Sequence, residues 1–428
     1  MNQYFSRLFS RPTHNFKPID GVRAIAVIWV IIFHAWLFQY NDFQTVGDGI
    51  FDSPFLIWIS KGDLGVDLFF VISGFLIGSI LFKEYKRTQQ INFKRFYARR
   101  FLRLMPVYVF SMILGVYFLN ETDPEGWKDA WSNLLYINNF VRNSYMGWTW
   151  SLAIEEQFYL VIPFLIAFII PRFKNKLIPF SLLALITIGL TYHYSFNILK
   201  FEVPFNSVFL DDAWEDWFWD YYMLTHLRYG GLLSGVVGAY LFVYHSEQLA
   251  SFFTKNKRLV NVLFLGSIAV FVLISSIALG QWTMLQNSIF DGMDPSIPQF
   301  YEVIHREIFC YVVLFILLSC MYSDSIYVQP INRFLSAKFF YPIAQVSYSA
   351  YLFHEMFMFW FFPKFNAMAV GQLDELTIVL LNSLISLVAI IFGATLMYLL
   401  IEQPFQDIKN KIGFGPSKSS EATRVGNS

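Results

Sequence analysis

Long apolar stretches recur along the chain, and each is close to the length that crosses a lipid bilayer. Crossing about 30 Å of hydrocarbon takes roughly 20 apolar residues in a helix. By this criterion about ten stretches qualify, near 22–40, 64–82, 104–119, 156–170, 177–193, 226–244, 259–280, 308–322, 343–362 and 375–401. Only 14% of the residues are charged, against about 25% in a soluble domain. We therefore predict an all-α integral membrane protein, a bundle of about ten transmembrane helices.

Three of these stretches, 104–119, 156–170 and 308–322, are shorter than the others. We expect their helices to be tilted or only partly buried. None of the stretches alternates apolar with polar residues, so we expect helices and not membrane-spanning strands.

The basic residues are unevenly distributed between the connecting segments on the two sides of the predicted membrane domain. If the N-terminus is cytoplasmic, most of the 31 Lys and Arg residues fall on cytoplasmic segments, above all on 83–103. The opposite set is poorer in basic residues and includes the acidic segment 211–220. Cytoplasmic loops of membrane proteins carry the excess of Lys and Arg. We predict that both termini are cytoplasmic, with a lead-in at 1–17, a membrane domain at 18–408 and a polar, disordered tail at 409–428.

An ionisable ring ends the first apolar stretch, which reads RAIAVIWVIIFH from 23 to 34. In a helix, Arg23 and His34 would lie about 16 Å apart along the axis and on nearly the same face. Arg23 also fits a positive-inside anchor, and His34 also fits a hydrogen-bonding residue between helices. However, ionisable groups inside a membrane usually line a cavity or a reaction path, and a neutral imidazole is a natural general base.

The basic connector KEYKRTQQINFKRFYARRFLR ends with two arginines, Arg100 and Arg103, one helical turn apart. The connector as a whole fits a positive-inside loop. Two guanidinium groups at the start of a helix also fit a phosphate-binding site. A cytoplasmic ligand rich in phosphate, such as coenzyme A, would suit this position.

Two further stretches combine polar residues with small or aromatic ones. In GDLGVDLFFVISGFLIG, Asp67 and Ser73 bring polar groups into the second apolar stretch, either as structural residues or as part of a site. In GWTWSLAIEEQFY, Trp150, Ser151 and Glu155 stand where an outer loop enters the fourth stretch. This group fits an aromatic belt with a helix cap, or a site in which a carboxylate orients the imidazole of the first stretch.

Aromatic residues and a second intramembrane histidine occur in the C-terminal half. SYSAYLFH places Tyr348 and His354 on different faces of the ninth stretch, where His354 also fits a packed polar residue between helices. The outer segment WEDWFWDYY contains Trp214, Trp217 and Trp219. These tryptophans fit an interfacial aromatic belt or flat faces on which sugars stack.

Five of these motifs, taken in order, resemble those of the acyltransferase-3 family of integral-membrane O-acyltransferases. They are RAIAVIWVIIFH, GVDLFFVISGFLI, FYARRFLRLMP, WSLAIEEQFYL and SYSAYLFH, and together they extend over 18–405. Each motif alone is short, whereas five in the family's order make the resemblance specific. The resemblance implies a ten-helix domain that transfers an acyl group, usually acetyl, from cytoplasmic acyl-CoA to a hydroxyl group of an extracytoplasmic carbohydrate.

The resemblance also implies roles for individual residues. Catalytic roles fall on His34, Arg23 and Glu155, and His34 would take the proton from the acceptor hydroxyl as it attacks the thioester carbonyl. Arg100 and Arg103 are expected to bind the donor substrate acyl-CoA, with acetyl-CoA preferred and no tightly bound cofactor. Further residues in the motifs are expected to line the site: Asp67, Ser73, Trp150, Ser151, Tyr348 and His354.

Many relatives carry an additional extracytoplasmic SGNH esterase-like domain. This chain ends 23 residues after Phe405, so we expect a stand-alone form that transfers the acyl group in one step or with a separate partner protein. The expected location is the bacterial cytoplasmic (inner) membrane. The expected partners are the lipid bilayer, acyl-CoA and a carbohydrate whose identity the sequence leaves open.

A multi-pass transporter or flippase without acyl-transfer chemistry is the alternative. Intramembrane His, Arg and Glu would then line a proton or substrate path. The sequence lacks the paired, interrupted segments in two matching halves that many transporters carry. The 31 basic residues are balanced by 31 acidic ones, so no nucleic-acid partner is expected. The two cysteines match no metal-binding spacing, and no metal is expected.

Overall fold

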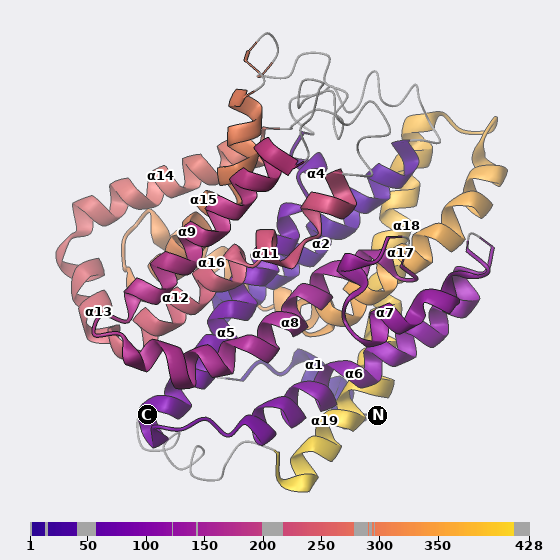
Figure 1. Ribbon diagram of the computed structural model, residues 1–428. Helices are drawn as coiled ribbons and strands as arrows, with labels where there is room; N and C mark the ends of the chain where they lie inside the picture. Colours follow the sequence, from indigo (N-terminus) through magenta and orange to yellow (C-terminus); the bar gives the residue numbers. More distant parts are fainter. Residues whose placement is uncertain are drawn as a thin grey trace.

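The computed structural model describes residues 2–12, 16–40, 57–121, 123–142, 144–198, 217–277, 290, 293–294 and 296–414. These residues form a bundle in which the axes of most long helices are similarly inclined (Figure 1). Eight of the helices found among the described residues are long and apolar enough to cross a membrane. The chain is therefore a multi-pass membrane protein with an all-helical fold, as predicted. Of the disordered tail predicted at 409–428, the part up to Phe414 is helical and the rest lies outside the described residues.

The membrane helices correspond to predicted apolar stretches, and most of them extend beyond those stretches. They are α2 (Lys17–Tyr40), α5 (Leu64–Thr88), α6 (Phe93–Phe118), α8 (Trp150–Phe164) with its continuation to Arg172, α9 (Leu177–His193), α14 (Lys257–Ser275), α15 (Ser296–Tyr322) and α18 (Glu375–Met397). The stretches at 104–119 and 308–322 were expected to be short spans, but α6 has 26 residues and α15 has 27. Helix α6 begins within the basic connector because Lys and Arg are good helix formers, so helix length exceeds apolar length.

Two other predicted stretches correspond to α12 and α17. Helix α12 (Gly230–Tyr244) has 15 residues and follows the separate turn α11 (Thr225–Arg228), so the stretch predicted at 226–244 is interrupted near Tyr229. Helix α17 (Phe340–Ala369) has 30 residues and carries several buried polar groups. These polar groups make α17 less apolar than a plain membrane span.

Helix α5 is the central helix, and α12 packs along it most closely. Of the apolar part of α5, 78% is buried, against 22% for α14 at the rim. A Cβ atom at Gly74 of α5 would lie 1.9 Å from the carbonyl oxygen of Leu232. A Cβ atom at Gly235 of α12 would lie 2.2 Å from the carbonyl oxygen of Val71. Glycine on both helices therefore allows the close backbone packing that holds helices together in lipid.

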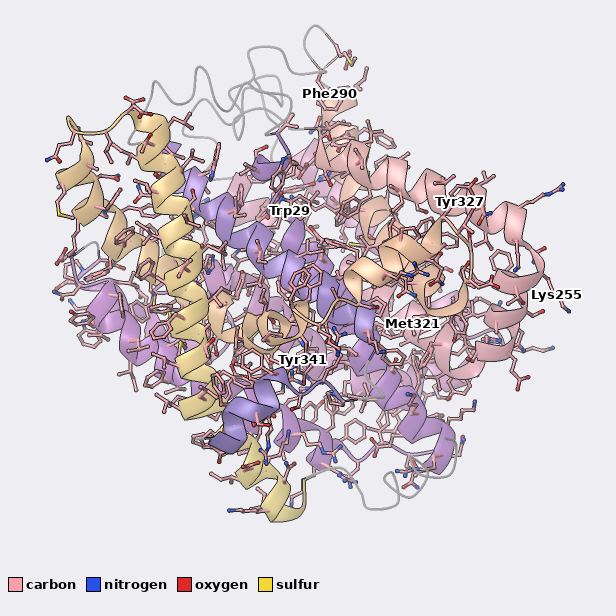
Figure 2. All side chains as sticks on the ribbon, turned by 180° about the vertical axis from the view of Figure 1, so that it is seen from behind. Trp29, Lys255, Phe290, Met321, Tyr327 and Tyr341 are labelled. Carbon is pink, nitrogen blue, oxygen red and sulfur yellow. The ribbon has the colours of Figure 1, made fainter. Side chains whose placement is uncertain are left out.

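The two ends of the described chain lie on the same side of the bundle. Arg7 of α1 (Asn2–Phe9) forms an ion pair of 2.8 Å with Asp407 of α19 (Gln403–Lys409). The Arg11 guanidinium lies 5.6 Å from the ring centroid of Tyr341. In the view from behind, Tyr341 lies in the lower half of the bundle (Figure 2). Termini on one side agree with an even number of membrane crossings. That this side is cytoplasmic rests on the distribution of basic residues and stays a prediction.

Candidate active site

Two helices that are far apart in the sequence bring ionisable groups together. Helix α17 packs against α2, and the Nδ1 atom of His34 lies 3.2 Å from the Nε2 atom of His354. The Nε2 atom of His34 lies 3.3 Å from a carboxylate oxygen of Glu355. A carboxylate that orients His34 was expected at Glu155, and this pairing is wrong. Glu155 belongs to α8 and faces a different cavity, whereas Glu355 follows His354 directly on α17.

The hydrogen bonds around the two imidazole rings indicate which nitrogen atoms carry protons. His354 Nδ1 lies 2.6 Å from the carbonyl oxygen of Tyr351, so this nitrogen donates and Nε2 of the same ring is an acceptor. His34 Nδ1 donates to the carbonyl oxygen of Val30 at 3.0 Å and toward His354 Nε2. The basic nitrogen of His34 is therefore Nε2, which faces Glu355. The Glu355 carboxylate therefore lies where it can stabilise a proton taken up at Nε2.

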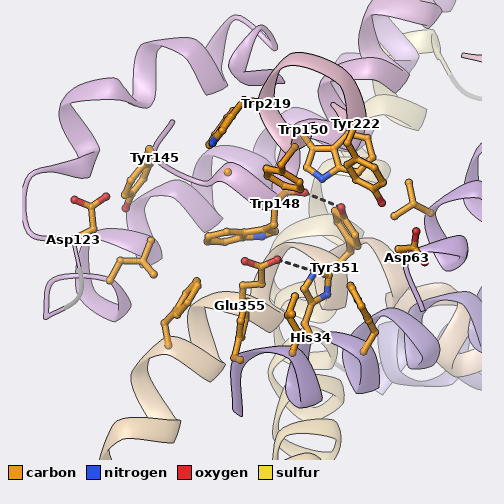
Figure 3. A pocket seen from close by; sticks show the side chains of 18 residues that line it. His34, Asp63, Asp123, Tyr145, Trp148, Trp150, Trp219, Tyr222, Tyr351 and Glu355 are labelled. Carbon is orange, nitrogen blue, oxygen red and sulfur yellow. Dashed lines mark hydrogen bonds and ion pairs between the residues drawn. The ribbon is translucent and has the colours of Figure 1, made fainter. Parts of the chain in front are cut away.

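A cavity of about 450 Å³, which we call the histidine cavity, opens above this group (Figure 3). Its walls are largely aromatic, and Figure 3 shows the Trp148 ring close to Glu355, with His34 beside it. Among the described lining residues the charged or ionisable ones are His34, Glu355, Asp63 and Asp123, and none is Lys or Arg. The aromatic lining includes Trp148, Trp150, Trp219, Tyr145, Tyr222 and Phe359. Flat aromatic faces with a few acceptor groups suit a polyhydroxylated ring.

A second cavity of about 260 Å³, which we call the arginine cavity, lies between α2, α5, α6, α8 and α17. It brings together most of the residues predicted from the motifs: Arg23, Arg100, Arg103, Glu155, Ser73, Ser151 and Tyr348. Three guanidinium groups against one carboxylate favour an anionic ligand. The predicted set of polar residues therefore forms two adjoining cavities, with His34 in one and its expected partners Arg23 and Glu155 in the other.

The guanidinium groups of the arginine cavity are held by neighbouring side chains. Arg23 donates from Nη2 to the hydroxyl oxygen of Ser347 at 3.1 Å. The Arg100 guanidinium lies 5.2 Å from the ring centroid of Tyr159, a cation–π contact. Glu155 lies close enough to Arg23 and Arg100 for direct electrostatic attraction. The cations are therefore fixed in position before a ligand arrives, which lowers the entropy cost of binding.

Tyr351 and Val66 line both cavities, so the two cavities share a wall. The Tyr351 hydroxyl donates to the carbonyl oxygen of Trp148 at 2.7 Å. It also lies 2.7 Å from the Ser151 hydroxyl, which must be the donor because the only Tyr351 proton is already used. The Tyr351 side chain therefore lies between the arginine cavity and the histidine cavity.

Two residues that were expected to line the site lie behind its walls. Asp67 is buried and accepts from Arg306 at 2.7 Å, with Arg228 at 3.4 Å. His354 is fully buried and touches the site through His34. Neither lines either cavity. Asp67 therefore belongs to a structural ion-pair network. Its partner Arg306 comes from α15, and residue spacing along α5 does not reveal which helix packs there.

Several site residues lie outside the set predicted from the motifs. Glu355 stands next to His354 in LFHEM, so a histidine followed by a carboxylate in an apolar stretch was an available signal. Tyr351 lies within the SYSAYLFH motif, whereas nothing in the sequence distinguishes Asp63 from a helix-capping residue. Of the outer tryptophans, Trp219 lines the histidine cavity and Trp217 is buried. Trp214 lies outside the described residues.

Comparisons with known proteins identify relatives of this chain. An O-acetyltransferase OatA of Staphylococcus aureus (strain NCTC 8325 / PS 47) is 30% identical over 375 residues, which are 82% of this chain and 52% of that protein. A peptidoglycan O-acetyltransferase OatA of Listeria monocytogenes is 35% identical over 190 residues, 40% of this chain and 27% of that protein. The chain thus spans about half the length of the first of these relatives, and no solved structure matches it. Residues 16–402 match the acyltransferase domain of the acyltransferase-3 type, and the chain belongs to this family.

Proposed function

We propose that the chain is a membrane O-acetyltransferase, which moves an acetyl group from cytoplasmic acetyl-CoA to a hydroxyl group of a carbohydrate on the opposite face. The observation that carries the proposal is the pair of cavities of different character that meet at Tyr351 beside His34. One cavity suits a phosphate-rich donor, and the other suits a sugar. The names of the relatives, which state O-acetyl transfer, support acetyl as the acyl group.

The arginine cavity is the proposed donor site. Arg23, Arg100 and Arg103 line it, and guanidinium forks bind phosphate oxygens through paired, charge-assisted hydrogen bonds. Arg23 lies near the start of α2, close to the end of the bundle that carries both termini. The phosphates of coenzyme A would bind here while the acetyl thioester extends toward Tyr351. This placement agrees with a donor that arrives from the cytoplasm.

The histidine cavity is the proposed acceptor site. The Nε2 atom of His34 removes the proton from the acceptor hydroxyl as its oxygen attacks the thioester carbonyl. The new C–O bond forms, the C–S bond breaks, and the coenzyme A thiolate leaves and takes up a proton from the imidazolium. Glu355 stabilises the imidazolium by its charge and position. His34 Nδ1 stays hydrogen bonded to Val30, which fixes the ring during the transfer.

Direct attack by the acceptor is favoured over an acyl-enzyme on Ser151. The Ser151 hydroxyl donates its proton to Tyr351 and has no base against it among its hydrogen-bond partners. A serine nucleophile needs an adjacent base. His34 has its basic nitrogen in the histidine cavity, where the acceptor itself would bind.

The test is transfer of labelled acetyl in membranes that contain the full chain. Labelled acetyl-CoA is added, and the label is followed into glycans, with peptidoglycan first because one relative's name states it. We expect transfer by the wild type, loss in His34→Ala, and unchanged transfer in His193→Ala, since His193 is exposed. Unchanged transfer in His34→Ala would refute the role of His34. Absence of transfer from any acyl-CoA would favour the transporter alternative.

A further inference from the structure

We propose that His34, His354 and Glu355 form a binding site for a transition-metal cation of the Zn²⁺ type, and that the bound ion inhibits the enzyme from its outer side. These three residues are called the histidine–glutamate cluster below. The metal-binding part is independent of the proposed acyl transfer, and only the inhibition depends on it. No spacing motif links the ligands, because 320 positions separate His34 from His354.

The geometry of the cluster is close to that of a zinc site. One donor atom from each residue lies within 4.8 Å of the other two. A Glu355 oxygen lies 3.3 Å from Nε2 of His34 and 3.7 Å from Nε2 of His354. Zinc binds imidazole nitrogen and carboxylate oxygen at about 2.0–2.2 Å in a tetrahedron, which places ligand atoms about 3.3–3.6 Å apart. Two of the three separations are near this range, and rotation of the two rings out of their mutual contact would bring the third donor atom to the same ion.

The outer hydrogen bonds of both imidazole rings are those of metal ligands. His34 Nδ1 donates to the carbonyl oxygen of Val30 at 3.0 Å, and His354 Nδ1 donates to that of Tyr351 at 2.6 Å. Both rings therefore keep the lone pair on Nε2, 3.3 Å and 3.7 Å from a Glu355 oxygen. The His354 lone pair also accepts from His34 Nδ1 at 3.2 Å, and an ion bound to the cluster would replace this contact. Metal-bound histidines usually donate their second N–H to a carbonyl or carboxylate in this way, which fixes the ring and the tautomer.

The cluster is also accessible from the histidine cavity. His34 and Glu355 line that cavity, and His354 closes the cluster from behind. Three protein ligands would leave one position of the tetrahedron open to water or to a hydroxyl group. Asp63 and Asp123 line the same cavity, and no Lys or Arg does so among the described residues. Asp63 is ion-paired with Arg306, so the carboxylates left to attract a cation are Glu355 and Asp123.

Metal binding has a direct chemical consequence. The ion takes the Nε2 lone pair of His34 that the proposed reaction needs, so the acceptor hydroxyl cannot transfer its proton to this atom. The arginine cavity holds none of the three ligands. We therefore expect inhibition that competes with the acceptor and leaves acetyl-CoA binding unchanged.

The binding test uses the purified full chain, stripped of metal with a chelator and titrated with ZnCl₂ in a calorimeter. We expect one Zn²⁺ per chain and a loss of affinity of at least about tenfold in His354→Gln, because one of three protein ligands is removed. The control His193→Ala alters an exposed histidine and should bind as the wild type does. MgCl₂ should give no binding, since Mg²⁺ prefers oxygen ligands. Thermal unfolding of each variant without metal confirms that it is folded.

Failure to bind Zn²⁺ stoichiometrically, or equal affinity in folded His354→Gln, would overturn the metal site. The inhibition is tested separately, by adding ZnCl₂ to the acetyl-transfer assay and reversing its effect with EDTA. Inhibition that weakens as acceptor concentration rises supports the proposal. Stoichiometric binding with no inhibition, or with activation, would overturn the inhibitory role. Absence of acetyl transfer without any metal would count against the proposed function and would leave the calorimetric result intact.

Discussion

Replacing Glu355 with glutamine removes the carboxylate beside His34 and keeps the size of the side chain. In the wild type a Glu355 oxygen lies 3.3 Å from Nε2 of His34. In Glu355→Gln the amide NH₂ group donates to Nε2 and occupies the lone pair that takes the proton. The imidazolium that forms during transfer also loses its counter-charge. Because Glu355 is only 7% exposed, water cannot replace either contribution.

The expected loss follows from the distance and from the size of general-base effects. Two unit charges 3.3 Å apart attract by about 5 kcal/mol at an effective dielectric constant of about 20. Removal of general-base catalysis costs about 10²- to 10⁴-fold in rate, which is about 3–5 kcal/mol. The two ranges overlap, so we expect kcat to fall by about 10²- to 10⁴-fold. The KM for acetyl-CoA should stay unchanged, because Glu355 does not line the arginine cavity.

The assay is the initial rate of labelled acetyl transfer in proteoliposomes with wild type, Glu355→Gln and Glu355→Asp. Aspartate keeps the charge at a greater distance, so its rate should lie between the other two. A purely structural role would lower the amount of folded protein and affect both substitutions alike. A Glu355→Gln enzyme within about threefold of the wild-type kcat would refute the role of Glu355, because general-base effects are far larger.

Three further substitutions test the two cavities and the packing. Arg103→Ala should raise the KM for acetyl-CoA about tenfold, which is the cost of one charge-assisted hydrogen bond. The control Arg87→Ala, on the exposed part of the same connector, should leave this KM unchanged. Equal KM values of the two variants in steady-state kinetics would contradict the donor site. Gly235→Val should abolish folded protein in detergent extracts, since even a Cβ atom there would lie 2.2 Å from a backbone oxygen. Gly266→Val should be tolerated, because a Cβ atom there would have nothing within 4 Å. Equal yields of the two variants by size-exclusion chromatography would contradict the helix packing. Tyr351→Phe removes the hydroxyl group that bonds both neighbours at the shared wall, so hydrolysis of acetyl-CoA without acceptor should rise relative to transfer; an unchanged ratio would contradict a separating role for this side chain.

The fold class could be predicted because the bilayer imposes it on the sequence. Apolar stretches of membrane length must form helices, since lipid offers no partner for free backbone groups. Helix ends could not be predicted this way, because residues such as those of FKRFYARR at the start of α6 are helical without being apolar. The interruption near Tyr229 leaves a signal in the sequence, since Arg228 precedes it and two glycines follow it, but the average over the apolar stretch conceals this signal.

The polar residues of the arginine cavity could be predicted as a group, but their division into two cavities could not. Spacing shows which residues share a face of one helix, as with Arg23 and His34 on α2. It does not show which helix packs against that face. The pairing of His34 with Glu355 depends on α17 lying against α2. Sequence reasoning therefore favours the carboxylate of α8 as the partner, whereas Glu155 lies in the other cavity.

The most direct test of the account is a transfer assay with the two membrane faces separated. Full-length protein is reconstituted in vesicles, and protease accessibility of the termini, which lie at one end of the bundle, identifies the molecules in each orientation. Labelled acetyl-CoA is sealed on the face that carries the termini, and glycan acceptor is present only on the other face. We predict label on the acceptor with the wild type and none with His34→Ala. Transfer only when donor and acceptor are on the same face would contradict the two-cavity mechanism.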